Sequence, residues 1–279
     1  MSIKYQNTKT LVTKDNNNSA NCIAPNIIYG CFGGCVSTYC YMSRYNGPKV
    51  FVNTNVDEIF QSVVEWENIY NKVPDQQDPV YTMVDIACNS DLVLMQKHCP
   101  IPLMDYLKMY DDHSQLNSTM ATKYPGLLKL DVNHFNKKPR VRVSLMPQSY
   151  SDVLEPKMQS IESRIHDINR LKELGWEVHI NYSPVIIHSN FVQDYFDLFQ
   201  MVKDIAGENK CEVIFLTNHP MQMKRAEGTD AENLMKLSSE VKNKSGVMRY
   251  PLSIKGEAIE LFKREYVKFF NINTIRYIF

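Results

Sequence analysis

The sequence predicts an α/β protein built as a full or partial (β/α) barrel, with an open doubly wound sheet as the competing architecture. Three observations support this fold class. Segments typical of strands alternate with segments typical of helices, six or seven strands are expected, and no long linker separates them. Such alternation is typical of parallel βαβ units. The 279 residues are enough for one large hydrophobic core.

The first half of the chain provides three expected strands and two helices. A short strand over 26–30 leads directly into a loop that contains cysteines. Apolar residues at helical spacing, among them Val56, Ile59 and Val63, predict a helix over 56–72. An apolar run over 79–88 predicts a buried strand. The next expected elements are a helix over 101–110 and a strand over 119–124.

The second half continues the alternation. Strict alternation of polar and apolar residues predicts a strand over 140–146. A long amphipathic helix over 157–174 ends at Gly175, which follows the helix as its C′ residue. The remaining expected elements are a strand over 177–187, a helix over 191–205, a strand over 212–217, a helix over 257–270 and a closing strand over 274–279.

Composition indicates one folded domain in a reducing compartment. A polar leader over 1–25 is expected to precede a single domain over 26–279, and 44% hydrophobic residues exclude a disordered chain. No stretch approaches the roughly 20 apolar residues of a membrane helix. The leader lacks the apolar core of a secretory signal. We therefore expect a cytoplasmic protein with no membrane partner.

Charge is balanced overall but unevenly distributed. Between residues 57 and 112 there are eleven acidic residues and three lysines, a net charge of −8, so the remainder carries +8. Part of this excess lies at Lys137, Lys138, Arg140 and Arg142. Such a cluster either contacts phosphates or forms a solvated face. Charge alone does not identify a nucleic-acid binder.

Three of the seven cysteines, Cys31, Cys35 and Cys40, fall within ten residues. The odd total argues against a disulfide framework. Two glycines between the first pair allow the backbone to wrap closely, so three thiolates can hold one metal cluster. A zinc site usually adds a fourth ligand with paired spacing; Cys22 is a candidate, but no C-x2-C pair is present.

The strand pattern places four features near one another. In barrels of this class, functional groups gather at the carboxyl ends of the strands. The cysteine loop follows the first expected strand, Cys88 ends the second, Lys123 ends the third and Ser144 lies late in the fourth. We therefore expect all four features to face the same mouth.

The cysteine loop resembles the cluster motif of the radical S-adenosylmethionine superfamily. That motif is usually C-x3-C-x2-C, whereas Cys31, Cys35 and Cys40 follow C-x3-C-x4-C. Further segments resemble spore photoproduct lyase in order along the chain, from about residue 27 to the C-terminus. They are Tyr39 to Met42, Asn55 to Phe60, Asp85 to Asp91, Ala121 to Tyr124, Arg142 to Ser144, Tyr182 to His188 and Ile275 to Phe279. The resemblance implies a barrel of the radical S-adenosylmethionine type.

The resemblance also implies a cofactor set. Cys31, Cys35 and Cys40 would ligate a [4Fe-4S] cluster whose open iron binds S-adenosylmethionine (AdoMet). One electron, from a donor such as flavodoxin or ferredoxin, would cleave AdoMet to methionine and a 5′-deoxyadenosyl radical. Lys123 and Ser144 would contact the methionine portion, because a cation suits its carboxylate.

The implied activity is a carbon–carbon lyase reaction in DNA repair that restores two thymines from a thymine dimer. Cys88 would return a hydrogen atom to a thymine radical, with Tyr39 and Tyr41 as relay residues. Without the resemblance, Cys88 is typical of a small buried hydrophobic residue. The substrate would be contacted by Arg249, Tyr250 and His219, in a region where the family's longer basic and aromatic stretch is not reproduced.

Three hypotheses for the function remain open. The first is a repair lyase resembling spore photoproduct lyase. The second is a radical AdoMet enzyme that modifies or rearranges another nucleobase, such as a modified thymine. The third is a metal-stabilised nucleic-acid binding module without catalysis, which the long spacing between Cys35 and Cys40 favours.

Overall fold

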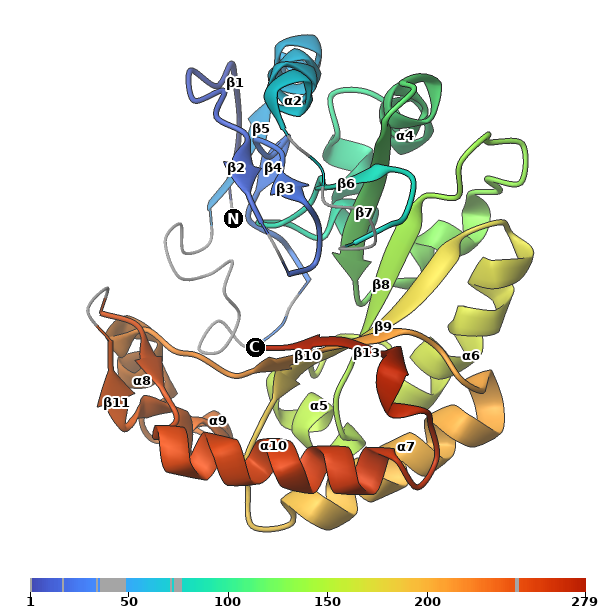
Figure 1. Ribbon diagram of the computed structural model, residues 1–279. Coiled ribbons are helices and arrows are strands. Elements are labelled where there is room, and N and C mark those ends of the chain that lie inside the picture. Colours follow the sequence, from blue (N-terminus) through green and yellow to red (C-terminus); the bar gives the residue numbers. More distant parts are fainter. Residues whose placement is uncertain are drawn as a thin grey trace. The chain divides into compact units, whose positions relative to one another are not determined.

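The structure, a computed structural model, describes residues 2–16, 18–33, 35, 49–70, 72, 77–243 and 246–279 (Figure 1). The chain divides into two compact units. Unit 1 contains Met1–Phe32, Asn46–Arg142 and Arg170–Val178, and unit 2 contains Gly33–Tyr45, Val143–Asn169 and His179–Phe279. The boundary falls inside two strands, β8 (Arg140–Leu145) and β9 (Glu177–Val185).

Parallel strands form the centre of unit 1. β3 (Cys22–Ile23) pairs in parallel with β6 (Thr82–Asp85), which pairs in parallel with β7 (Leu116–Thr122). All four residues of β6 are buried, as expected of a parallel strand covered on both faces. β2 (Lys14–Asp15) is antiparallel to β3 at the edge. The helices of this unit are α2 (Val56–Ile69), α3 (Leu92–Met95) and α4 (Leu103–Asp112).

A second, three-stranded sheet in unit 1 corrects two expectations. It contains β1 (Ser2–Gln6), β5 (Lys49–Asn53) and β4 (Ile28–Tyr29), with β1 parallel and β4 antiparallel to β5. Residues 2–6 are therefore part of a sheet, not of a separate leader. The strand expected over 26–30 belongs to this sheet, and the strand parallel to β6 is β3, earlier in the chain.

Unit 2 has parallel strands covered by two long helices. β9 pairs in parallel with β10 (Cys211–Phe215), and β10 with β13 (Ile275–Ile278). α7 (Phe191–Ala206) and α10 (Leu252–Tyr266) pack on one face, where the Tyr182 ring lies 5.4 Å from Phe199 and 5.7 Å from Phe262 (Figure 1). Because side chains alternate along a strand, His179 and Asn181 of β9 face away from these helices.

The remaining elements complete the alternation of strands and helices. They are α5 (Gln148–Leu154), α6 (Ile161–Glu173), α8 (Pro220–Ala226), α9 (Asp230–Met235), the hairpin of β11 (Val241–Lys242) and β12 (Met248–Arg249), and four 3-10 turns at Gln96–His98, Pro125–Lys129, Leu237–Ser239 and Ile272–Thr274. The large sheet has the strand order β13-β10-β9-β8-β7-β6-β3-β2. Within the described ranges, no helix combines the length and apolar character needed to span a membrane.

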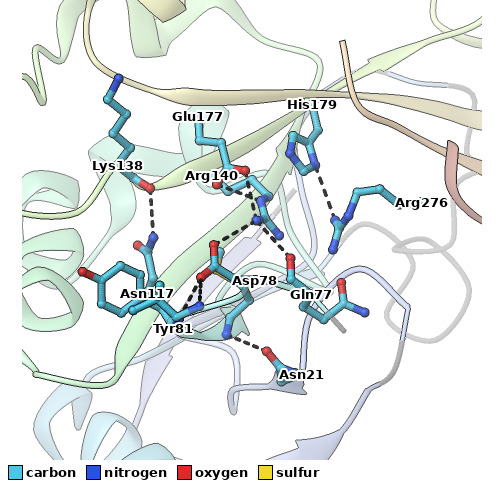
Figure 2. Close-up of polar contacts among 12 residues, drawn as sticks. Asn21, Gln77, Asp78, Tyr81, Asn117, Lys138, Arg140, Glu177, His179 and Arg276 are labelled. Atoms are coloured by element: carbon cyan, nitrogen blue, oxygen red, sulfur yellow. Dashed lines mark hydrogen bonds and ion pairs between the residues drawn. The ribbon is translucent and has the colours of Figure 1, made fainter. Parts of the chain in front are cut away.

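The basic cluster at residues 137–142 lies inside unit 1, so its expected roles as a phosphate-binding or solvated face are wrong for three of its four members. Lys137, Arg140 and Arg142 are 6%, 1% and 4% exposed, and only Lys138 is exposed. Figure 2 shows the Arg140 guanidinium directed toward Asp78 and Glu177, with a nitrogen 3.0 Å from a Glu177 carboxylate oxygen. A basic run in sequence looks the same whether its charges meet solvent or buried acceptors.

Lys137 and Arg142 have equally specific internal partners. The Lys137 ammonium donates to the backbone carbonyls of Tyr110, His113 and Leu116, next to the C-terminal end of α4. A cation there satisfies carbonyls that have no partner within the helix. Arg142 forms a buried ion pair of 2.7 Å with Asp85.

Candidate functional site

The candidate site lies in unit 1 at the carboxyl ends of β6 and β7. These strands are parallel neighbours, with Thr82 opposite Leu116 and Asp85 opposite Thr119, so the loops that follow them leave the sheet at the same edge. In open parallel α/β sheets this edge is where ligands bind. Cys88 lies in the loop after β6, and Lys123 follows β7.

The start of the cysteine loop is fixed against the loop after β6. The Gly30 N–H donates to the Asn89 carbonyl at 2.9 Å, and the Ser90 hydroxyl donates to the Gly30 carbonyl at 2.8 Å. Gly30 has a φ of +90°, and a Cβ there would lie 2.7 Å from the carbonyl oxygen of Lys49. Only glycine fits such a position. Cys31, the next residue, is half-buried.

The two bonds to Gly30 come from the residues that directly follow Cys88. Burial, and next the negative charge of Asp85, raise the Cys88 pKa to about 12, while Arg142 opposes the effect of Asp85. Asp85 accepts from the Ala87 N–H at 3.1 Å and is held by Arg142. Cys88 therefore remains a protonated thiol at neutral pH. This makes it a poor nucleophile but keeps its S–H bond available for hydrogen-atom transfer.

Lys123 is attached to the same loop through Asp91. The buried Asp91 carboxylate accepts from the Lys123 N–H at 3.0 Å and from the Thr122 hydroxyl at 3.0 and 3.1 Å. It also accepts from the Leu94 N–H at 3.1 Å, capping α3. The Lys123 side chain is half-buried. The structure thus joins the start of the cysteine loop, the loop that contains Cys88 and the backbone of Lys123, while the roles expected of these side chains stay predictions.

Ser144, the fourth expected feature, belongs to unit 2. It is buried, and its hydroxyl oxygen accepts from the Asn181 side-chain amide at 3.3 Å. The Arg164 guanidinium donates to the Ser144 carbonyl at 3.2 Å. Asn181 is 5% exposed, and its side-chain oxygen has no hydrogen-bond partner within the described part of the chain. Contact of Ser144 with AdoMet stays a prediction.

Four expected site residues have little or no description in the structure. Tyr39, Cys40 and Tyr41 lie outside the described residues, and Cys35 is half-buried in unit 2. Among the residues with described positions, no three Cys, His, Asp or Glu side chains gather as ligands of one metal ion. Since Cys40 is one of the three expected ligands, the assignment of the cluster ligands stays a prediction.

The expected substrate-contacting residues differ in their surroundings within unit 2. Tyr250 is 1% exposed, and its hydroxyl oxygen accepts from the Ile187 N–H at 3.1 Å, so it packs in the core and has no surface with which to contact a substrate. His219 is half-buried and caps α8 by accepting from the Met221 N–H. Arg249 is half-buried on β12, and its Nε has no hydrogen-bond partner in the described ranges.

Sequence reasoning assigned no role to Ser90, Asp91 or Asp85, although all three organise the site. One signal was present for Asp91, because it directly precedes the apolar run Leu92–Met95, and Asp before such a run is typical of a helix N-cap. The bond from Ser90 to Gly30 spans 60 positions, and the pair of Asp85 with Arg142 spans 57. No local pattern reveals contacts of that separation.

Solved structures share this fold over nearly the whole chain. A spore photoproduct lyase variant with bound AdoMet and dinucleoside spore photoproduct has a TM-score of 0.82 and 20% identity, covering 99% of this chain and 82% of that chain. A spore photoproduct lyase complexed with dinucleoside spore photoproduct gives the same values. The chain therefore has the α/β fold of these solved structures, the fold class that the sequence predicts.

The family follows from the sequence comparison. The model of the family described as spore photoproduct lyase matches residues 5–236, and the chain belongs to this family. Spore photoproduct lyase of Geobacillus sp. (strain Y412MC61) is 26% identical over 190 residues, which cover 67% of this chain and 52% of the relative. That of Clostridium acetobutylicum is 25% identical over 196 residues, covering 70% and 55%. The matched parts thus span about half the length of these curated relatives.

Proposed function

We propose that this protein is a radical AdoMet lyase that repairs a thymine-dimer lesion of the spore photoproduct type in DNA. One observation carries the proposal: the start of the cysteine loop, the Cys88 loop and Lys123 are joined by direct hydrogen bonds within unit 1. A cluster ligand, a hydrogen-atom donor and a cation for the cofactor carboxylate are the groups that this chemistry requires in one place. Membership of the spore photoproduct lyase family supports the choice of reaction.

The residues present fit the proposed cofactors. Cys31 and Cys35 are half-buried thiols, and thiolates are the usual ligands of iron–sulfur clusters. Lys123, half-buried at the carboxyl end of β7, provides the cation that a carboxylate requires. When bound, the cluster and AdoMet supply a 5′-deoxyadenosyl radical that abstracts a hydrogen atom. Cys40 would complete the cluster ligands, and Ser144 would contact the methionine portion.

Cys88 acts, in this proposal, after the carbon–carbon bond of the lesion has broken. Its S–H bond breaks, the hydrogen atom forms a new C–H bond on the thymine radical, and the sulfur is left as a thiyl radical. The raised pKa of Cys88 keeps the sulfur protonated, which this step requires. Tyr39 and Tyr41 would return a hydrogen atom to the sulfur.

The proposed substrate is a lesion in DNA. Solved relatives are described with dinucleoside spore photoproduct, which supports a lesion of this type as substrate. Arg249 would contact a phosphate, because it places a half-buried cation on β12. The neighbouring Lys255 has its pKa lowered by burial and by the positive charge of Arg249, so the two cations form an electropositive pair. His219 would lie near the base.

The proposed partners follow from the chemistry. The reaction needs one electron for each AdoMet cleaved, which a flavodoxin or ferredoxin would supply. The compartment would be the cytoplasm, where thiols remain reduced.

The test is a reaction of the anaerobically reconstituted, reduced protein with AdoMet and dinucleoside spore photoproduct. Mass spectrometry would follow 5′-deoxyadenosine and the restored thymines together. We expect both products from the unaltered protein. Cys31→Ala should lose iron and both products, while Cys88→Ala should form 5′-deoxyadenosine without clean repair. Cys99→Ala is the matched control, because the Cys99 thiol donates to the Met95 carbonyl in the same unit and has no role in the proposed reaction, and it should retain both products.

Each other outcome contradicts part of the proposal. 5′-Deoxyadenosine without repair would retain radical chemistry and favour another nucleobase as substrate. Neither product from protein that holds its iron would overturn the enzymatic function and favour a binding module.

A further inference from the structure

The tripeptide Asn89-Ser90-Asp91 contacts both neighbouring parts of the candidate site. Asn89 and Ser90 bond to the backbone of Gly30, on the side of the cysteine loop. Asp91 bonds to Lys123, on the side of β7. Ser90 and Asp91 are 1% and 6% exposed, so these bonds are shielded from water. Shielded polar bonds hold their geometry more strictly than exposed ones.

The Asp91 carboxylate divides its two oxygens between different tasks. Oδ1 accepts from the Leu94 N–H, which caps α3, and Oδ2 accepts from the Lys123 N–H. The Thr122 hydroxyl lies between them, within 3.1 Å of both oxygens, and it also accepts from the Tyr124 N–H. One carboxylate therefore holds the Thr122 hydroxyl and the backbone nitrogen of Lys123.

Fixing the backbone there sets the direction of the Lys123 side chain. The Cα–Cβ vector of a residue is determined by the positions of its backbone atoms, and the Lys123 nitrogen is held 3.0 Å from Oδ2. Burial raises the Asp91 pKa, and the hydrogen bonds from Lys123, Leu94 and Thr122, together with the Lys123 charge, oppose this rise.

We infer that Asp91 is a positioning residue that aims Lys123 toward the carboxylate of AdoMet and keeps it in register with the cysteine loop. The inference rests on the proposed function. Asp91 touches no cofactor in this role: it acts through the backbone of Lys123, while Ser90 keeps Gly30 in place. A purely structural alternative is that Asp91 only caps α3, a helix of four residues.

Asp91→Asn separates the two roles. Asn is as good an N-cap as Asp, and with its oxygen toward the Leu94 N–H it preserves the cap. Its NH₂ group then replaces Oδ2 and faces the Lys123 N–H, donor against donor. The variant thus loses the hydrogen bond from the Lys123 N–H while α3 retains its N-cap. Thr122→Val is the matched control, because it removes the hydroxyl bonds from the same carboxylate but leaves the Oδ2 bond to the Lys123 N–H.

The experiment has two readouts on the full chain reconstituted anaerobically with iron and sulfide. Amide hydrogen exchange of Lys123, with and without AdoMet, reports directly whether its N–H is hydrogen-bonded to residue 91. The equilibrium Kd for AdoMet, from titration of the oxidised cluster form, reports its consequence. We expect Asp91→Asn to accelerate exchange at Lys123 but not at Leu94, and to raise the AdoMet Kd about tenfold or more, the usual scale for loss of a supporting bond. Thr122→Val should leave exchange at Lys123 slow and change the Kd less.

The contradicting results are equally specific. An unchanged AdoMet Kd in Asp91→Asn, with fast exchange at Lys123, would overturn the positioning role. Fast exchange at both Leu94 and Lys123 with no effect on the AdoMet Kd would show that Asp91 acts only as the N-cap of α3. Should Asp91→Asn fail to fold, Asp91→Ser retains a capping hydroxyl that does not reach Lys123, and the same two measurements apply. If the unaltered protein binds no AdoMet while exchange at Lys123 is slow, the proposed function fails, and the cofactor-directed role of Asp91 is overturned with it.

Discussion

Substitution of Arg142 tests whether this side chain binds DNA phosphates or stabilises the core of unit 1, because its charge is compatible with either role in the sequence. As part of a basic run in the sequence, it would bind DNA phosphates. In the structure it forms a 2.7 Å ion pair with Asp85, and both side chains are 5% exposed. Arg142→Met removes the positive charge while keeping an unbranched apolar side chain. The change leaves the Asp85 carboxylate buried, with the Ala87 N–H and the Ser19 hydroxyl as its other donors.

The expected cost is large. Removing one partner of a buried ion pair destabilises a protein by about 3–5 kcal/mol, since the remaining charge loses its compensation. Total stabilities are about 5–15 kcal/mol, so the loss is a substantial fraction of the free energy of unfolding. The double variant Asp85→Asn with Arg142→Met should recover most of the loss. The amide oxygen introduced at position 85 still accepts from the Ala87 N–H, and neither charge of the original ion pair remains.

Urea unfolding of the full chain, followed by tryptophan fluorescence, measures this effect. Both tryptophans of the chain, Trp66 and Trp176, belong to unit 1, so the signal reports the unit that contains the ion pair. The midpoint should fall with little change in slope. Lys138→Met is the control: its side chain is exposed, and surface changes usually stay within about 0.5 kcal/mol. An Arg142→Met variant with unchanged stability and weakened DNA binding would show that Arg142 contacts DNA and does not stabilise unit 1 through Asp85.

The remaining predictions concern four side chains. Because folding raises the Cys88 pKa from 9.0 to about 12, iodoacetamide at pH 9 should alkylate Cys88 at least about a hundredfold more slowly than in the unfolded chain; equal rates in mass-spectrometric mapping would contradict the burial. Lys137→Met should lower the urea midpoint, because three carbonyls lose their donor; an unchanged midpoint would exclude that role. Arg249→Ala should remove one phosphate contact, so the slope of the logarithm of the DNA-binding constant against the logarithm of salt concentration should fall in magnitude by about 1. Tyr250→Phe should weaken stability and leave that slope unchanged; the reverse pattern would make Tyr250 the DNA contact.

The central elements of the fold could be predicted from sequence because their patterns are local. The apolar run around β6, the alternation in β8 and the helical spacing in α2 and α7 each depend on neighbouring residues. β1 and β3 were missed, because short strands at a sheet edge or with only two residues have no periodicity to detect. The backbone pairing with β5 and β6 that defines them involves residues far along the chain.

The candidate site likewise has features that local sequence patterns predict and features that they do not. Cys88 and Lys123 could be placed at strand ends from the strand pattern alone. The bonds that connect them, through Ser90 and Asp91, depend on how loops from different strands meet. The basic run was misinterpreted for a related reason: the charge of Arg142 is visible in the sequence, but its pairing with Asp85 is not.

The role of Cys88 as hydrogen-atom donor is tested most directly by the isotope content of the repaired thymine when the reaction runs in D₂O. A thiol hydrogen exchanges with solvent, so Cys88 would carry deuterium before each turnover. We expect one deuterium in one of the two thymines released from dinucleoside spore photoproduct, and no such product from Cys88→Ala. Repaired thymine without deuterium, or equal deuterium content from Cys88→Ala, would contradict the assignment of Cys88 as the hydrogen-atom donor.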